Sequence, residues 1–298
     1  MMETKILKFR LKGNASFNIR EGWLHKGMLA VEKNPYVFTS SDASEVLGVG
    51  SKMVTAIKYW LLTTGLCEER IVSNRKGLYI TTNLGKIIQE YDPYFEDMFT
   101  LYILHSKIVA NKENSIVWNL FFNNFNVKEF TKDEMFSMLQ HELEKVLGNN
   151  LHFSQSLFID DCNSVLKMYA DSNSECLDPE ENQYSPFIAL GLLKRTGTTQ
   201  DYSKHAPKFG DIDKLAILYV IMSKMEDSKH SVNSQDLLNQ DNNIGHVFNL
   251  TRPIINEYLD QLKNAGFIEL NRTGNIDVVY VKKSLTQESV LRTYYTQE

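Results

Sequence analysis

Two stretches of helical pattern, separated by a glycine break and followed by a hairpin pattern, constrain the fold of this chain more than any other feature. The first helix is expected over residues 43–47, the break over 48–50 and the second helix over 52–63, where apolar residues recur at three- and four-residue spacing. Strands are expected at 67–72 and 78–81, joined by a polar tip at which Arg and Lys precede a glycine. Helix, glycine turn, helix and hairpin in this order predict a winged helix-turn-helix.

The same order of patterns returns near the end of the chain. Residues 214–224 form a strongly apolar helical segment, and a short helix is expected at 235–239. A further helix is expected after Thr251, with a proline in its first turn, where the missing N–H breaks no helical hydrogen bond. Strands at 267–270 and 278–281 complete a second hairpin. We therefore expect a second winged helix here.

The middle of the chain is helical by pattern. Helices are expected over 115–125, 132–147 and 154–169, and Thr131 with Glu134 forms the sequence signature of a capping box. A further helix-turn-helix is an open alternative for this region, with its hairpin near 187–193.

The fold class that these patterns predict is mainly α (α+β), with tandem winged helix-turn-helix modules joined by a helical middle region. The 298 residues suit two or three domains, each large enough to bury its own core. We place an N-terminal winged-helix module at 1–90, a helical middle domain at 91–200 and a C-terminal winged-helix module at 201–298.

Charge is distributed unevenly along the chain. The net charge is −5, but residues 1–90 carry +5, residues 91–200 carry −8 and residues 201–298 carry −2. An acidic field repels DNA, so we expect the middle region to bind a protein partner or to be simply solvated, the two readings being equally weighted. The residues expected to bind a basic partner are Asp178, Glu180 and Glu181.

The predicted DNA-binding residues lie off the apolar stripes of the two modules. Hydroxyls and lysines on one helix face suit phosphates and base edges, and basic residues at a hairpin tip suit a phosphate or the minor groove. A solvated surface, or one used for protein contacts, is the alternative. The predicted DNA-binding residues are Ser51, Lys52, Thr55, Lys58, Arg75 and Lys76 in the first module, and Arg252 and Arg272 in the last.

The register of the helix at 52–63 depends on Trp60. Met53, Ala56, Ile57 and Trp60 share one face at helical spacing. We expect Trp60 to be buried against the first helix of its module, near Trp23, so that Lys52 and Lys58 face outward.

The sequence contains no pattern that calls for catalysis, a metal or a cofactor. Its three cysteines form no Cys-x-x-Cys pair, and the 48–53 segment departs from phosphate-binding loops because Ser51 separates the glycine from the lysine. Asp160 and Asp161 are adjacent on a predicted helix, point about 100° apart and are expected on a solvated face. No apolar run reaches the roughly 18–20 residues of a membrane span, and no apolar signal core follows Met1. We expect a cytoplasmic, non-enzymatic protein without membrane contact, with nuclease activity as a minor alternative.

Several segments resemble a bacterial family of unknown function. They are Phe-Asn-Ile-Arg-Glu-Gly-Trp-Leu-His-Lys-Gly at 17–27, Leu-Gly-Val-Gly-Ser-Lys-Met-Val at 47–54 and Ile-Lys-Tyr-Trp-Leu at 57–61, with weaker likeness at 154–169 and 185–192. Members of that family are typically encoded beside phosphoadenosine-phosphosulfate-reductase-like proteins in phage-defence islands, including DNA phosphorothioation and BREX-type systems. The chain departs from the family at Asn14-Ala15-Ser16-Phe17, where relatives have His-Glu-Thr-Phe, so any chemistry of that His or Glu is not carried over.

The resemblance implies a context of defence, DNA and a sulfur-handling partner. Together with the winged-helix patterns it leads us to expect a non-enzymatic DNA-binding or adaptor subunit of a phage-defence or DNA-modification system. The expected partners are double-stranded DNA and a phosphoadenosine-phosphosulfate-reductase-like or other defence-system protein. A scaffold for a reductase-like or ATPase partner and a transcriptional regulator of its own locus are the alternatives.

Overall fold

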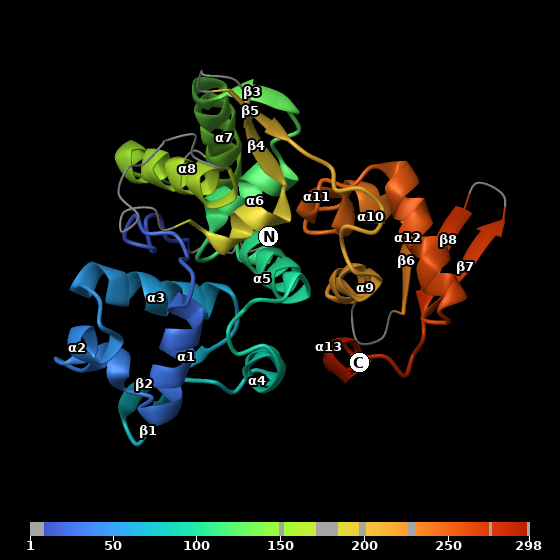
Figure 1. Cartoon of the computed structure of the whole chain (residues 1–298). Helices are drawn as coiled ribbons and strands as arrows, with labels where there is room; N and C mark the ends of the chain where they lie inside the picture. Colours follow the sequence, from blue (N-terminus) through green and yellow to red (C-terminus); the bar gives the residue numbers. More distant parts are fainter. Residues whose placement is uncertain are drawn as a thin grey trace, which may run out of the picture.

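Helices make up most of the fold, and three small antiparallel sheets lie among them, so the expected α+β class is confirmed (Figure 1). The computed structural model describes residues 9–148, 152–170, 184–196, 201–225, 230–273 and 276–296. The sheets have the strand orders β1-β2, β3-β5-β4 and β6-β8-β7. Within the described residues, no helix is both long and apolar enough to cross a membrane.

The N-terminal elements follow the expected order of helix, helix and hairpin. They are α1 (Trp23–Lys33), the 3-10 helix η1 (Val37–Thr39), α2 (Ala43–Leu47), α3 (Ser51–Thr63), β1 (Glu68–Val72) and β2 (Arg75–Tyr79). Helix α1 lies close to α3 because Gly27 has no side chain: a Cβ there would come within 2.7 Å of Cγ2 of Ile57. Leu78 also donates its backbone N–H to the carbonyl of Pro35, which joins the second strand to the loop after α1.

The hairpin turn is shorter than the sequence pattern suggested. Ser73 and Asn74 both have positive φ, 50° and 61°, and form a two-residue connection between the strands. Arg75 and Lys76 therefore lie in strand β2, opposite Val72 and Ile71, rather than at the tip where we expected them.

Trp60 is completely buried, which confirms the expected register of α3. Its indole Nε1 donates to the carbonyl of Phe17 at 2.9 Å, and its ring meets Trp118 edge-on with 5.5 Å between centroids. Phe17 in turn lies beside Trp23, at 6.4 Å between ring centroids. The residue thus joins α3 to the segment before α1 and to helix α6.

Between residues 83 and 204, the described residues form five α-helices, one 3-10 helix and a three-stranded sheet. These elements are α4 (Asn83–Tyr91), α5 (Met98–Ala110), α6 (Ile116–Asn123), β3 (Glu129–Thr131), α7 (Lys132–Leu147), α8 (Gln155–Tyr169), the 3-10 helix η2 (Pro186–Leu190), β4 (Leu193–Thr196) and β5 (Asp201–Lys204). The predicted capping box is present, because Thr131 accepts from the Glu134 backbone and the Glu134 carboxylate accepts from that of Thr131. The segment expected to hold a hairpin begins instead with η2, and the hairpin is β4–β5.

The C-terminal elements also follow the expected order, with three additions. They are α9 (Lys214–Met222), β6 (Ser231–Asn233), α10 (Ser234–Asn239), α11 (Ile244–Val247), α12 (Arg252–Asn264), β7 (Ile268–Thr273), β8 (Ile276–Val281) and α13 (Gln287–Thr296). The additions are β6, α11 and α13. In both three-stranded sheets the strand that comes last in the sequence is the central one. Strand β5 lies between β3 and its hairpin partner β4, and β8 lies between β6 and its hairpin partner β7.

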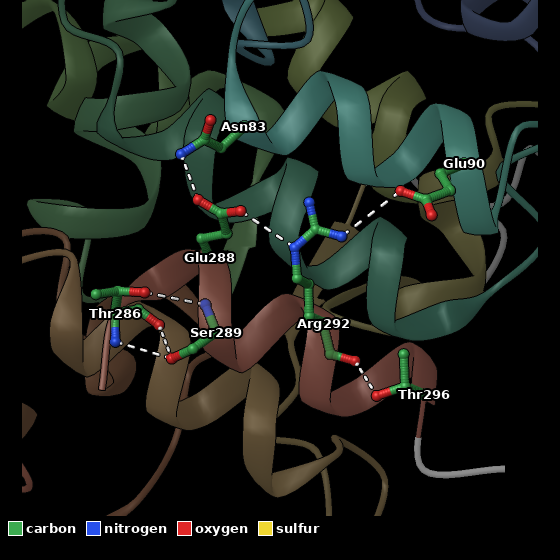
Figure 2. A network of polar contacts seen from close by, with 7 residues as sticks. All are labelled: Asn83, Glu90, Thr286, Glu288, Ser289, Arg292 and Thr296. Atoms are coloured by element: carbon green, nitrogen blue, oxygen red, sulfur yellow. Dashed lines mark hydrogen bonds and ion pairs between the residues drawn. The ribbon is translucent and has the colours of Figure 1, made fainter. Parts of the chain in front are cut away.

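Helix α13 fastens the end of the chain to the N-terminal half. Figure 2 shows Arg292 between two carboxylates, Glu288 of its own helix and Glu90 of α4, while Asn83 donates to Glu288 at 2.8 Å. Farther along α13, the ring of Tyr294 stacks on Phe99 of α5 with 3.7 Å between centroids. The helix therefore contacts α4, α5 and α9, which come from three parts of the sequence.

His105 makes a second connection between distant segments. It is fully buried on α5, with Nδ1 2.8 Å from the hydroxyl of Tyr169 and Nε2 2.6 Å from the carbonyl of Val247. A carbonyl only accepts, so Nε2 carries the proton and Nδ1 accepts from Tyr169. The neutral ring thus satisfies both partners, and burial lowers the pKa of His105 to about 4.

Replacing Trp60 with Ala should lower the free energy of unfolding by about 3–5 kcal/mol, because a fully buried indole leaves a cavity between α3 and α6. Chemical denaturation followed by circular dichroism measures this change. Val46, which is 55% exposed on α2, gives the control: Val46→Ala should change stability by less than about 0.5 kcal/mol. A loss of under about 1 kcal/mol for Trp60→Ala would contradict the packing described.

The free energy of unfolding should also fall as pH decreases from about 6.5 toward 4. The unfolded chain binds a proton on His105 in this range while the folded chain does not, so the folded state loses up to about 1.4 kcal/mol per pH unit from this group. Denaturation at a series of pH values, compared with His105→Gln, isolates the contribution. The free energy of unfolding of the variant should depend less steeply on pH than that of the wild type. Equal slopes for the two proteins would contradict the role given to His105.

Candidate nucleic-acid interface

The exposed face of α3 carries the predicted hydroxyls and a lysine. Ser51, Lys52 and Thr55 are exposed, whereas Ala56 and Ile57 are buried. Because α3 is held by its apolar stripe, these side chains project away from the core at the start of the helix. Their arrangement suits hydrogen bonds to phosphates or base edges.

A groove of about 670 Å³ runs between α3 and the β1–β2 hairpin and brings three predicted residues together: Thr55, Lys58 and Lys76. Arg10, which precedes α1, and Glu113, in the connection from α5 to α6, complete its described charged lining with Glu68 and Glu69. Among the described residues, the groove therefore contains basic and acidic side chains in equal number. Ser51 and Lys52 lie outside it.

Glu69 neutralises two of the predicted lysines. Its Oε1 is 2.8 Å from Nζ of Lys58 and its Oε2 is 2.5 Å from Nζ of Lys76. Burial alone would raise the pKa of Glu69, but the hydrogen bonds from both lysines outweigh it and lower that pKa. One carboxylate thus links the helix to the hairpin and leaves the three residues with a net charge of +1.

Arg75 projects from the other face of the hairpin. Neighbouring residues of a strand point to opposite sides, so Arg75 faces away from Lys76. Its guanidinium lies 3.9 Å from the centroid of the Tyr36 ring, and the Tyr36 hydroxyl accepts from that of Tyr79 at 3.2 Å. Stacking on an aromatic ring leaves the guanidinium edge available for an anion.

The floor of the groove offers no reactive group near neutral pH. Tyr59 is buried and donates its hydroxyl to the carbonyl of Asn114 at 2.6 Å, and burial followed by the nearby Asp161 raises its pKa. Burial likewise raises the pKa of the Cys67 thiol to about 12. Both groups therefore stay protonated at neutral pH, which makes them weak nucleophiles.

The paired aspartates of α8 have a structural role that the sequence did not indicate. Asp161 is buried, contrary to our expectation of a solvated face, and accepts from the Lys12 backbone at 2.9 Å. Asp160 is half-exposed and pairs with Nζ of the same lysine at 2.6 Å. Asn14 bonds Ser164 nearby, so this segment is tied to α8, and burial raises the pKa of Asp161 to about 7.

The predicted basic residues of the C-terminal elements are engaged within the fold. Arg252 is half-buried and donates from Nη1 to the backbone and side-chain oxygens of Ser234, both at 3.1 Å. Arg272 pairs with Asp260 of α12 at 3.1 Å and lies 3.8 Å from Asp277 of β8. These contacts fasten α12 to its neighbours, which makes the α3 face the better candidate.

The set of residues predicted to bind partners differs from the set that the structure describes at the candidate site in two ways. The expected partner-binding residues Asp178, Glu180 and Glu181 lie outside the described residues. Conversely, Arg10 and Glu113 line the groove but were not predicted, because no local pattern links residues about 50 positions from α3 to its surface. Within the described residues, no group of three or more His, Cys, Asp or Glu side chains is placed to hold a metal ion.

Fold and groove define an α+β protein with an ion-paired groove beside an exposed helix. The chain belongs to the family described as "Protein of unknown function (DUF4007)", whose model matches residues 12–295. Two solved structures share the fold, titled "Magnesium ion-bound SspB crystal structure" and "SspB crystal structure". Each has a TM-score of 0.85 and 21% sequence identity over 96% of this chain and 87% of the other. A comparison with curated proteins gave no match.

Proposed function

We propose that the chain is a DNA-binding or adaptor subunit built from tandem winged-helix modules. The observation that carries the proposal is the exposed Ser51, Lys52 and Thr55 on α3, beside a hairpin that carries Arg75 and Lys76. In this interpretation α3 is the recognition helix and β1–β2 is the wing. Phosphate contacts from both elements would position the duplex, and the start of α3 would face the bases.

The sheet topologies support the modular part of the proposal. In the middle and C-terminal regions a helix, a short strand, further helices and a hairpin follow one another, with the last strand central in the sheet. The N-terminal region has the same order, with the Pro35 carbonyl in place of the first strand. We interpret the three regions as three winged-helix modules, of which the first offers the basic surface.

The resemblance described for the sequence provides a biological setting. Relatives encoded near phosphoadenosine-phosphosulfate-reductase-like proteins in phage-defence islands suggest that the DNA-binding subunit acts with such a protein in DNA modification or defence. In that setting the chain would hold DNA while its partner performs the chemistry.

Replacing Arg75 and Lys76 together with Ala should weaken DNA binding and flatten the plot of log K against log salt by roughly 1.8, because each lost phosphate contact removes about 0.9. Titration of a fluorescent duplex at several salt concentrations measures the slope. Lys132→Ala with Lys145→Ala on α7, which lies far from the hairpin in Figure 1, is the charge-matched control and should leave the slope unchanged. An unchanged slope in the hairpin variant would remove it from the DNA surface.

Replacing Glu69 with Gln should have the opposite effect on DNA affinity. The change frees Lys58 for a phosphate contact in addition to that of Lys76, so the salt slope should steepen by roughly 0.9. Stability should fall by less than about 1 kcal/mol, because these ion pairs are partly exposed. Glu129→Gln on the exposed edge of β3 controls for net charge alone. Equal gains in the two variants would show that the groove has no specific role.

A further inference from the structure

A second cavity, of about 760 Å³, lies where the loop before α1 meets the break between α2 and α3. Its lining consists of Arg20, Glu21, Gly22, Trp23, Lys26, Gly48, Val49, Gly50, Met53 and Tyr184. All of these except Tyr184 come from two segments, 17–27 and 47–54, which carry the family resemblance noted in the sequence. The fold thus brings both segments to one hollow, which the DNA-binding proposal does not use.

Gly50 is the N-cap of α3, a position where glycine is common, although neither its backbone conformation nor its packing excludes a side chain. Its φ of −63° and ψ of 156° suit any residue, and a Cβ at this position would meet no atom within 4 Å. The open space beside Gly50 would let a bound molecule approach the backbone closely. A side chain introduced at position 50 would extend into this open space and narrow the cavity.

The cavity wall combines apolar surface with cationic side chains. Trp23 is buried, Val49 and Met53 are half-buried, and Tyr184 is 46% exposed, so its ring is available for stacking. Arg20 is half-buried with its guanidinium 5.0 Å from the Trp23 ring centroid, and burial lowers its pKa.

Lys26 and Glu21 are exposed at the edge of the cavity, so the ionisable side chains of its described lining, Arg20, Glu21 and Lys26, carry a net charge of +1. Partial burial of a cation strengthens its attraction to an anion. A ligand with a flat aromatic ring and an attached anionic group would match this lining. The volume of the cavity lies within the range of small-molecule binding sites.

We propose that this cavity binds one nucleoside monophosphate, with the base against Tyr184 and the apolar wall and the phosphate beside Arg20 and Lys26. The nucleotide is either free or an unpaired nucleotide of DNA. The DNA case rests on the proposed function, since Gly50 directly precedes Ser51 on the exposed face of α3. A nucleotide displaced from a duplex on that face would have this cavity next to it.

The first experiment titrates the full chain with the four deoxynucleoside monophosphates and follows tryptophan fluorescence and heat of binding. Of the three tryptophans, only Trp23 lines the cavity, and Trp60 and Trp118 are fully buried elsewhere. Wild type should bind at least one nucleotide saturably, and Gly50→Phe and Tyr184→Ala should each bind at least about tenfold more weakly. Val46→Phe adds the same ring to exposed α2 surface outside the cavity and should bind like wild type.

Either of two results would overturn the proposal. One is no saturable binding to wild type up to about 10 mM of any of the four nucleotides. The other is equal binding by wild type and a folded Gly50→Phe variant. Circular dichroism verifies folding, and Tyr184→Ala decides the question alone if Gly50→Phe does not fold.

The second experiment separates the two sources of the nucleotide. A duplex with one unpaired nucleotide is compared with a fully paired duplex of the same flanking sequence. Preference for the first in wild type, lost in Gly50→Phe, assigns the cavity to DNA. Equal affinity for both duplexes, with saturable mononucleotide binding, assigns it to free nucleotides. Failure to bind either duplex would reject the proposed function, while the mononucleotide titration would still decide the cavity.

Discussion

The burial of Trp60 determines which face of α3 reaches solvent, and both proposed binding regions depend on that face. The indole has its N–H bonded to Phe17 and its edge against Trp118, so the helix cannot rotate without opening the core on two sides. Successive helical residues point about 100° apart, so a shift of one position could bring Lys52 to the half-buried place of Met53. Tight packing of one aromatic residue thus positions polar side chains two to three turns away.

Polar and aromatic contacts of α13 and His105 connect the N-terminal and C-terminal halves of the chain. Helix α13 reaches back to α4 through Arg292 and to α5 through Tyr294, and His105 links α5 to the carbonyl of Val247. In its neutral form His105 donates to the Val247 carbonyl and accepts from the Tyr169 hydroxyl; protonation would turn Nδ1 into a donor, so the O–H of Tyr169 would lose this acceptor. These groups therefore join α4 and α5 to α11 and α13 in addition to the shared apolar core.

Local patterns predicted the elements well, because helix periodicity and hairpin composition are properties of neighbouring residues. The bounds of α7 agree with prediction, since Thr131 and Glu134 mark its start in the sequence itself. Non-local contacts could not be predicted in this way. The burial of Asp161 depends on Lys12, 149 positions away, and the groove receives Glu113 from beyond α5. The position of Lys76 was also missed, because composition did not distinguish a two-residue turn from a longer tip.

The position of Glu69 bears on how a groove of balanced charge would select the polyanion proposed as its ligand. Lys58 and Lys76 are already paired, so an incoming anion must displace a carboxylate held by two lysines. Each partly exposed ion pair contributes less than about 1 kcal/mol. A single anion that displaced Glu69 would gain about as much and would also lose its own hydration, so its binding would bring no net gain in free energy. A duplex presents a phosphate about every 1.7 Å of its axis and releases condensed counterions as each is neutralised. In the proposed function, exchange of Glu69 for phosphate would favour a polyanion over a monovalent competitor, and Glu69 would compete with simple anions for the two lysines.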